Sequence, residues 1–175
     1  GNCPMVPNHL AVIMALWFGG DDFRRSIDIA ASAGWDTDCN AGNVGCLNAI
    51  RLGLDAIDAD VDLRGPVADR MYVVSTDGGD CIYDAVRETR KILRAAAALN
   101  GETVDLPAQR YAFEMPGSVQ GFLIHPTHPF DQAARRLENT LAKTGKPGLA
   151  IEYQGVSGSV TASVSVQTYV DPAPK

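Results

Sequence analysis

Several features are scarce in this 175-residue chain, and each absence excludes a class of protein. Lys and Arg total 15 against 21 Asp and Glu, which gives a formal net charge of −6. The chain therefore lacks the basic character that binding to a nucleic-acid backbone requires. The apolar stretch from Ala11 to Phe18 is too short to span a bilayer and follows no basic region. We therefore expect no nucleic-acid partner, no membrane partner and no signal peptide.

Cysteine chemistry is limited as well. The chain has four cysteines but no Cys-x-x-Cys element, which argues against a zinc site. Cys39 and Cys46 fall on one predicted helix, about 10 Å apart along its axis, which is too far for a disulfide. We expect reduced, mostly buried thiols in a cytoplasmic protein.

The residues that are present indicate an ordinary globular chain, with 46% hydrophobic and 21% charged residues. Apolar residues recur with helical periodicity in four segments, bounded by Asp or Asn at the start and Gly at the end. These segments are residues 8–18, 21–34, 38–54 and 80–99.

The pattern changes after Gly101, where prolines recur and apolar residues alternate. We predict short strands at residues 110–114 and 119–124, and either a short helix or an extended segment at 131–143. Residues 149–156 and 159–170 alternate on both sides of a Gly-Val-Ser-Gly turn, which predicts a β-hairpin.

The stretch with the clearest chemistry joins the second and third predicted helices. It places Asp36 and Asp38 two residues apart, after Gly34 and at the start of a helix. Positions i and i+2 diverge on a regular helix, but they can converge in a turn that enters one. Two carboxylates in such a turn suit Mg²⁺ or Ca²⁺, which prefer oxygen ligands. The alternative is that one Asp simply caps the helix, and the spacing leaves both interpretations open.

A family resemblance rests on the same stretch, Gly34-Trp35-Asp36-Thr37-Asp38-Cys39, with glycines following at 42 and 45. It resembles the C-terminal metal motif of the ADP-ribosylglycohydrolase family, which usually reads Gly-Gly-Asp-Thr-Asp-Thr before a helix of small residues. The two preceding helices agree with that family, so the resemblance covers about residues 1 to 100. There are two departures. Trp35 replaces the second glycine, and Cys39 replaces a Thr hydroxyl with a thiol, which is a poor Mg²⁺ ligand.

The resemblance implies a fold class and a domain division. We expect a mainly α chain, in which residues 1–101 form the C-terminal part of an all-α catalytic domain. Residues 102–175 would then form a small β-rich segment, the start of an accessory module.

The resemblance also implies a site. It predicts a centre of two Mg²⁺ ions, with Mn²⁺ able to substitute, and metal ligands at Asp36, Asp38 and Cys39. Asp36 and Asp38 would be the catalytic residues. The expected substrate-binding residues are Trp35, Thr37, Gly42 and Asn43.

The activity implied is hydrolysis of the glycosidic bond of an ADP-ribosyl group on a protein or a ribosyl small molecule. Family members carry an earlier half with a Thr-Asp-Asp motif, whereas Thr76-Asp77 is followed here by Gly78. We therefore expect an N-terminal half of the same domain or a companion subunit to complete the enzyme. Two alternatives remain: a non-catalytic subunit that binds ribose or ADP-ribose, and an N-glycosidase acting on another ribosyl compound.

Overall fold

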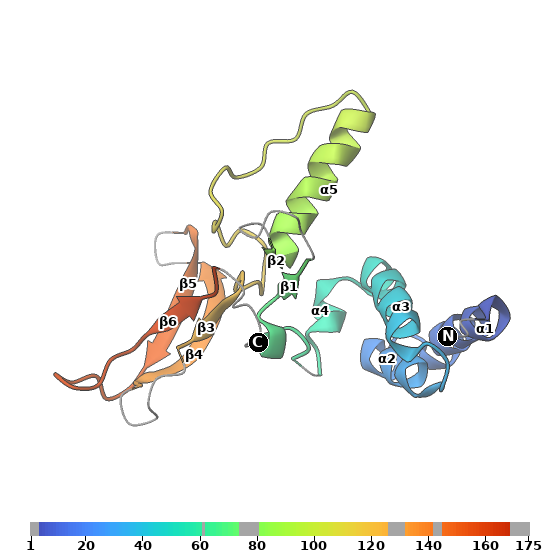
Figure 1. Cartoon of the computed structure of the whole chain (residues 1–175), viewed down its shortest axis with the longest axis horizontal. Coiled ribbons are helices and arrows are strands. Elements are labelled where there is room, and N and C mark those ends of the chain that lie inside the picture. The colour runs from blue at the N-terminus through green and yellow to red at the C-terminus, as the bar shows by residue number, and fades with distance from the viewer. Residues whose placement is uncertain (1–3, 61, 74–80, 126–131, 142–144, 169–175) are drawn as a thin grey trace, which may run out of the picture. The chain divides into compact units, whose positions relative to one another are not determined.

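The chain forms two compact units, Gly1–Leu63 (unit 1) and Arg64–Lys175 (unit 2), shown as a ribbon in Figure 1. The computed structural model describes residues 4–60, 62–73, 81–125, 132–141 and 145–168. Unit 1 is built from helices, whereas unit 2 combines short strands with one long helix.

Unit 1 is helical, with α1 (Met5–Gly19), α2 (Phe23–Ser32), α3 (Thr37–Leu52) and the short α4 (Leu54–Ile57). The start of α2 agrees with the sequence pattern, because the Asp22 carboxylate accepts a hydrogen bond from the Arg25 backbone N–H at 2.8 Å. Such a cap satisfies one of the unpaired N–H groups at a helix start.

Small residues let the three longer helices of unit 1 approach closely. Ala15, Ala30 and Val44 are fully buried where α1, α2 and α3 meet. At the end of α1, a Cβ on Gly19 would lie 2.7 Å from the Ser26 Cα of α2. The crossing of α1 and α2 therefore depends on the absence of a side chain at Gly19. On the far side of α1, the apolar stripe of Leu10, Ile13, Met14 and Trp17 is exposed.

Unit 2 combines short strands with one long helix. Its elements are the 3₁₀ turn η1 (Gly65–Val67), β1 (Arg70–Tyr72), β2 (Ile82–Asp84), α5 (Ala85–Leu99), β3 (Phe122–Ile124), β4 (Ala134–Leu141), β5 (Pro147–Tyr153) and β6 (Val164–Val166). The strands pair antiparallel as β1 with β2, β3 with β6, and β4 with β5. The cap of α5 is Asp84, whose carboxylate accepts from the Arg87 N–H at 3.0 Å.

The expected mainly α fold class is wrong. The described residues contain five α-helices and six strands, so the fold is mixed. Two of these strands, β1 and β2, precede α5 and lie within the residues that were expected to be all-α. Strands of three residues show no usable alternation in the sequence. β2 lies inside the segment 80–99 that was predicted to be helical, and α5 begins only at Ala85.

The strand predictions after Gly101 are correct in part, because β3 lies within the strand predicted at 119–124. Residues 110–114 form no strand, and β4 within 131–143 confirms the extended alternative for that segment. The predicted hairpin is wrong, because β5 pairs with β4 and β6 pairs with β3. Asn139 on β4 shows why local alternation did not fix the pairing. Its side-chain amide donates to three carbonyls of the 113–118 segment, at 2.7 to 3.0 Å.

The domain boundary predicted after residue 101 was drawn where the family resemblance ends. The two units are defined by compactness alone, so they do not test that boundary, and it stays a prediction. α5 belongs to the second compact unit, Arg64–Lys175. Among the described residues, the helices are too short or too polar to cross a membrane. The cytoplasmic location stays a prediction.

Candidate metal centre

The turn between α2 and α3 has an unusual backbone. Gly34 has a φ of +78°, and Asp36 has φ 40° and ψ 51°, in the left-handed region. A residue with a side chain adopts this region rarely, at a cost of roughly 1–3 kcal/mol, and such residues cluster at functional sites. The turn thus holds Asp36 in a conformation that the surrounding structure must stabilise.

The alternative that Asp36 merely caps the helix is not supported by its hydrogen bonds. Asp36 occupies the N-cap position of α3, but its side chain makes no capping bond. Its carboxylate instead accepts a hydrogen bond from the Asn8 side-chain amide of α1 at 3.4 Å. The carboxylate is therefore directed by a tertiary contact.

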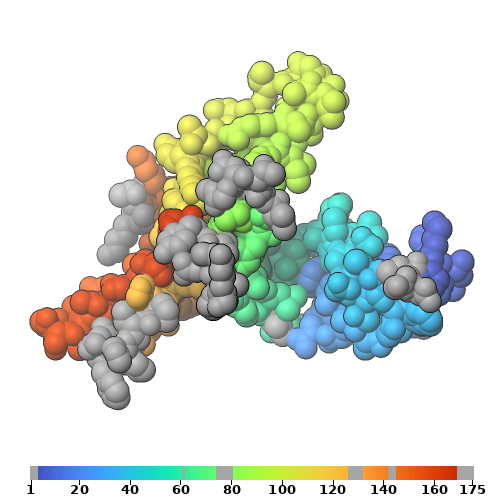
Figure 2. All heavy atoms as spheres, in the orientation of Figure 1, coloured from blue at the N-terminus to red at the C-terminus, as the bar shows by residue number. Residues whose placement is uncertain are grey.

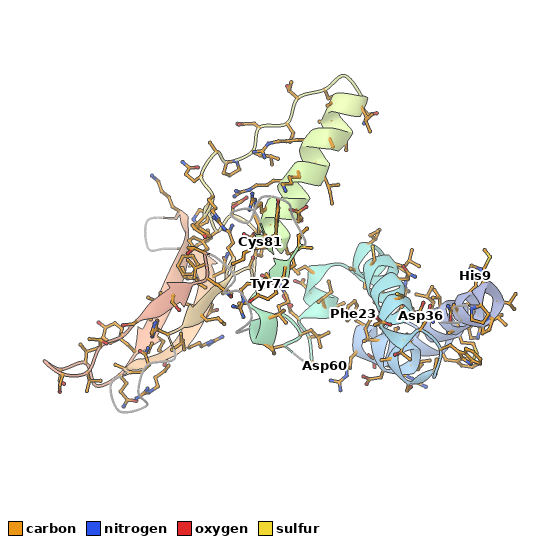
Figure 3. All side chains as sticks on the ribbon, in the orientation of Figure 1. His9, Phe23, Asp36, Asp60, Tyr72 and Cys81 are labelled. Atoms are coloured by element: carbon orange, nitrogen blue, oxygen red, sulfur yellow. The ribbon has the colours of Figure 1, made fainter. Side chains whose placement is uncertain are left out.

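The structure brings the three predicted ligands together. One oxygen each from Asp36 and Asp38 and the Cys39 sulfur all lie within 4.8 Å of one another. Asp36 is half-buried, whereas Asp38 and Cys39 are exposed in the first turn of α3. Figure 3 labels Asp36 at the start of α3, and His9 on α1. This is the group of potential metal ligands found among the residues that the structure describes.

The side-chain amides of Asn8 and Asn40 donate hydrogen bonds to the turn between α2 and α3. The Asn40 side-chain amide donates to the Trp35 backbone carbonyl at 2.7 Å and to the side-chain Oδ1 of Asn8 at 3.5 Å. Asn40 is only 3% exposed, so these bonds form away from water. Asn8 and Asn40 together link α1 and α3 to the turn that carries Asp36.

The predicted substrate-binding residues surround this turn in different environments. Asn43 lines a cleft of about 210 Å³ between α1 and α3, together with Asn8, His9 and Asn40. Trp35 is 49% exposed, so its ring is not buried in the helical core. Gly42 faces open space, since a Cβ there would meet no atom within 4 Å. Thr37 is half-buried, and the roles of these residues stay predictions.

Asn8 is the residue of the site that the sequence did not reveal. The first helix was expected to begin there, but α1 begins at Met5, so Asn8 lies inside the helix. The available signal was a polar residue of low helix propensity at the head of an apolar stripe. Two cysteines also differ from expectation, because Cys39 and Cys46 are exposed rather than buried.

Comparison with known proteins decides the family. The model of the ADP-ribosylglycohydrolase family matches residues 1–100, which is more than half of the chain. The chain belongs to the ADP-ribosylglycohydrolase family. No curated protein and no solved structure gave a match. Membership indicates hydrolysis of a glycosidic bond, and it confirms the resemblance drawn from the Asp36 stretch.

The side chains in this ADP-ribosylglycohydrolase chain fit a hard divalent cation in part. Asp36 and Asp38 offer carboxylate oxygens, and the exposure of Asp38 leaves room for the water ligands that Mg²⁺ retains. The Cys39 thiol in the same group is a soft ligand, better suited to other metals. The two carboxylates therefore fit Mg²⁺, whereas the third position does not favour it.

Proposed function

We propose that this chain provides the Asp36–Asp38 metal ligands of a metal-dependent glycosidase that cleaves the bond between an ADP-ribosyl group and its carrier. The observation that carries the proposal is the position of the Asp36 carboxylate. It lies at a helix N-cap without capping the helix, and it approaches Asp38 and Cys39. A strained residue whose side chain is not used for capping is better explained by a ligand role.

Each residue around the turn has a defined part in this proposal. The carboxylates of Asp36 and Asp38 would hold Mg²⁺, or Mn²⁺ in its place, since both favour oxygen ligands. Bound metal would supply Lewis-acid polarisation and orientation of a ribose diol. The Asn8 amide orients the Asp36 carboxylate, and Asn40 fixes the Trp35 carbonyl.

The substrate would lie along the same turn. Asn43 lines the cleft between α1 and α3 and offers an amide to a sugar hydroxyl. The half-exposed Trp35 ring offers a face on which a base or a ribose can stack. Thr37 and Gly42 border the same turn, with Gly42 leaving the substrate room to approach the α3 backbone. The substrate would be an ADP-ribosylated protein or a ribosyl small molecule.

The proposal also includes a companion, either an N-terminal half of the domain or a separate subunit. Unit 1 exposes large apolar side chains on α1 and α3, including Trp17 at 78% and Ile50 at 81%. Between α1 and α3 is a groove of about 500 Å³, lined by Ile13, Leu16, Trp17, Leu47, Asn48 and Arg51. The Asn48 side-chain nitrogen is buried there with no hydrogen-bond partner. A large exposed apolar surface, next to a buried N–H donor that has no hydrogen-bond acceptor, is typical of a protein interface.

The companion would supply the acid that assists departure of the leaving group or activates water. Native mass analysis of the purified protein tests for it. A bound polypeptide should be lost from a Trp17→Ser/Leu47→Ser variant. It should be retained by Ile92→Ser, which removes an exposed apolar residue from α5. If the wild type and both variants are monomeric and carry no other polypeptide, the proposal of a companion is contradicted.

The activity is tested by release of ADP-ribose from ADP-ribosylated protein in the presence of Mg²⁺. Asp36→Asn and Asp38→Asn should each abolish turnover. The matched control is Asp55→Asn, because Asp55 is an exposed acid of α4 in the same unit. Unaltered turnover in both site variants would refute the proposal.

A non-catalytic ADP-ribose-binding subunit is the second candidate, and Cys39 favours it. A thiol in the ligand group weakens a Mg²⁺ centre without preventing recognition of the sugar. Titration with ADP-ribose separates the two functions. Binding without hydrolysis, with the companion present, would support the second candidate.

A further inference from the structure

A second site is formed in unit 2, where the segment that follows α5 runs back along the helix (Figure 1). A pocket of about 300 Å³ lies between the two. Five of its eight lining residues are cationic: Arg87, Arg90, Lys91, Arg94 and Arg110. In a chain of net charge −6, such a concentration of positive charge is unusual.

The pocket has a fixed base. Arg90 is 5% exposed, and its guanidinium donates to Glu114 Oε1 at 2.5 and 2.8 Å. It also donates to the Gln109 carbonyl at 2.8 Å. Arg90 therefore holds residues 109–114 against α5, and its own charge is neutralised by Glu114. Arg90 has a positioning role here, and the other cations form the walls.

The helix places the remaining cations on one face, since residues three and four apart are neighbours on a helix surface. Arg87 and Lys91 lie over the Tyr83 ring, with 4.1 and 3.9 Å to its centroid. A hydrogen bond with the Tyr83 phenol raises the pKa of Lys91 above its ordinary value, and Glu88 at 3.1 Å adds to this effect. Lys91 therefore stays charged at neutral pH.

Two arginines lack a carboxylate partner. Within the described part of the chain, neither Arg94 on α5 nor Arg110 on the returning segment lies within ion-pair distance of an acidic group. Both are exposed, and both line the pocket. Like charges facing one pocket repel each other, and an anion bound between them would remove that repulsion.

We propose that this pocket binds the phosphate groups of a small phosphate-bearing molecule, with Arg94 and Arg110 making the direct contacts. A guanidinium presents paired N–H donors that match phosphate oxygens bidentately. The volume lies at the small end of ligand pockets, which suits a compact anion. Figure 2 shows the returning segment packed beside α5, in unit 2. The site uses no residue of the metal centre, so it stands independently of the proposed glycosidase activity.

The test is calorimetric titration of the full chain with inorganic pyrophosphate in the presence of EDTA. Chelation removes divalent metal, so the Asp36–Asp38 centre cannot contribute to the signal. The wild-type protein should bind saturably with a stoichiometry of one. Arg94→Gln/Arg110→Gln should weaken binding at least tenfold, because each arginine supplies charge-assisted hydrogen bonds.

Arg136→Gln is the matched control, since Arg136 is an exposed arginine of β4 outside the pocket. It should bind as the wild type does. Absence of saturable binding, or an equal loss in both variants, would overturn the proposal. A parallel titration with ADP identifies the source of the phosphate: tighter binding than pyrophosphate assigns a nucleotide, and equal or weaker binding assigns an inorganic or simpler phosphate.

Discussion

Replacing Gly19 by Ala should destabilise unit 1 and leave unit 2 unaffected. The added Cβ would lie 2.1 Å from Ser26 Oγ and 2.7 Å from Ser26 Cα. Rotating the serine side chain cannot relieve the contact with Cα, so α1 and α2 must separate. Overpacking of this kind costs about 1–3 kcal/mol, which exceeds the gain of roughly 1 kcal/mol from replacing a helical glycine.

Gly42→Ala is the matched control, and its expected effect has the opposite sign. Gly42 lies inside α3, and a Cβ there would meet nothing within 4 Å. The substitution should therefore stabilise unit 1 by about 0.5–1 kcal/mol through backbone entropy and helix propensity. The substitution of Gly by Ala therefore tests helix packing at Gly19 of α1 and helix propensity at Gly42 of α3.

Tryptophan fluorescence during thermal unfolding provides the assay, because the two tryptophans of the chain, Trp17 and Trp35, both belong to unit 1. A domain of this size shifts its melting temperature by about 4–8 °C per kcal/mol. Gly19→Ala should melt lower than the wild type, and Gly42→Ala should melt higher. The reasoning fails if Gly19→Ala melts at or above the wild-type temperature.

Three further predictions concern single contacts. Cys39→Thr replaces a soft thiol with a hydroxyl, so Mg²⁺ affinity measured by calorimetry should rise about tenfold and Cd²⁺ affinity should fall; unchanged affinities for both would contradict the ligand role. Asn8→Ala removes the amide that orients the Asp36 carboxylate and should weaken Mg²⁺ binding about tenfold, whereas equal affinity would show that the contact has no such role. Arg90→Met leaves the Glu114 carboxylate without its partner and should lower the stability of α5, followed by hydrogen exchange in urea, by about 3–5 kcal/mol. Adding Glu114→Gln should recover most of this loss, and strictly additive losses would argue against the coupling.

The helices could be predicted because their signals are local. Asp22 accepts the bond expected at the start of α2, and Asn100 follows α5 directly, although α5 begins at Ala85 rather than at Asp80. The strands depend on longer-range contacts. Asn139 secures β4 by bonding to carbonyls more than 20 residues away, and no alternation of residues encodes that choice.

The candidate site divides in the same way. The motif around Asp36 and Asp38 was recognisable because ligands that are close in sequence share one turn. The contribution of Asn8 was not, since its contact with Asp36 spans 28 residues and depends on the packing of α1 against α3. The cationic pocket on α5 could not be predicted from the sequence, because Arg94 and Arg110 come from different segments of the chain. Only the burial of Arg90 against Glu114 shows that the chain returns to enclose it.

The central claim is that the carboxylates at the start of α3 bind a divalent metal. Calorimetric titration with Mn²⁺ tests it most directly, on the wild type, Asp36→Asn, Asp38→Asn and the Asp55→Asn control. The account predicts binding by the wild type and the control, with affinity at least tenfold lower in the two site variants. Equal Mn²⁺ affinity in all four proteins would contradict it.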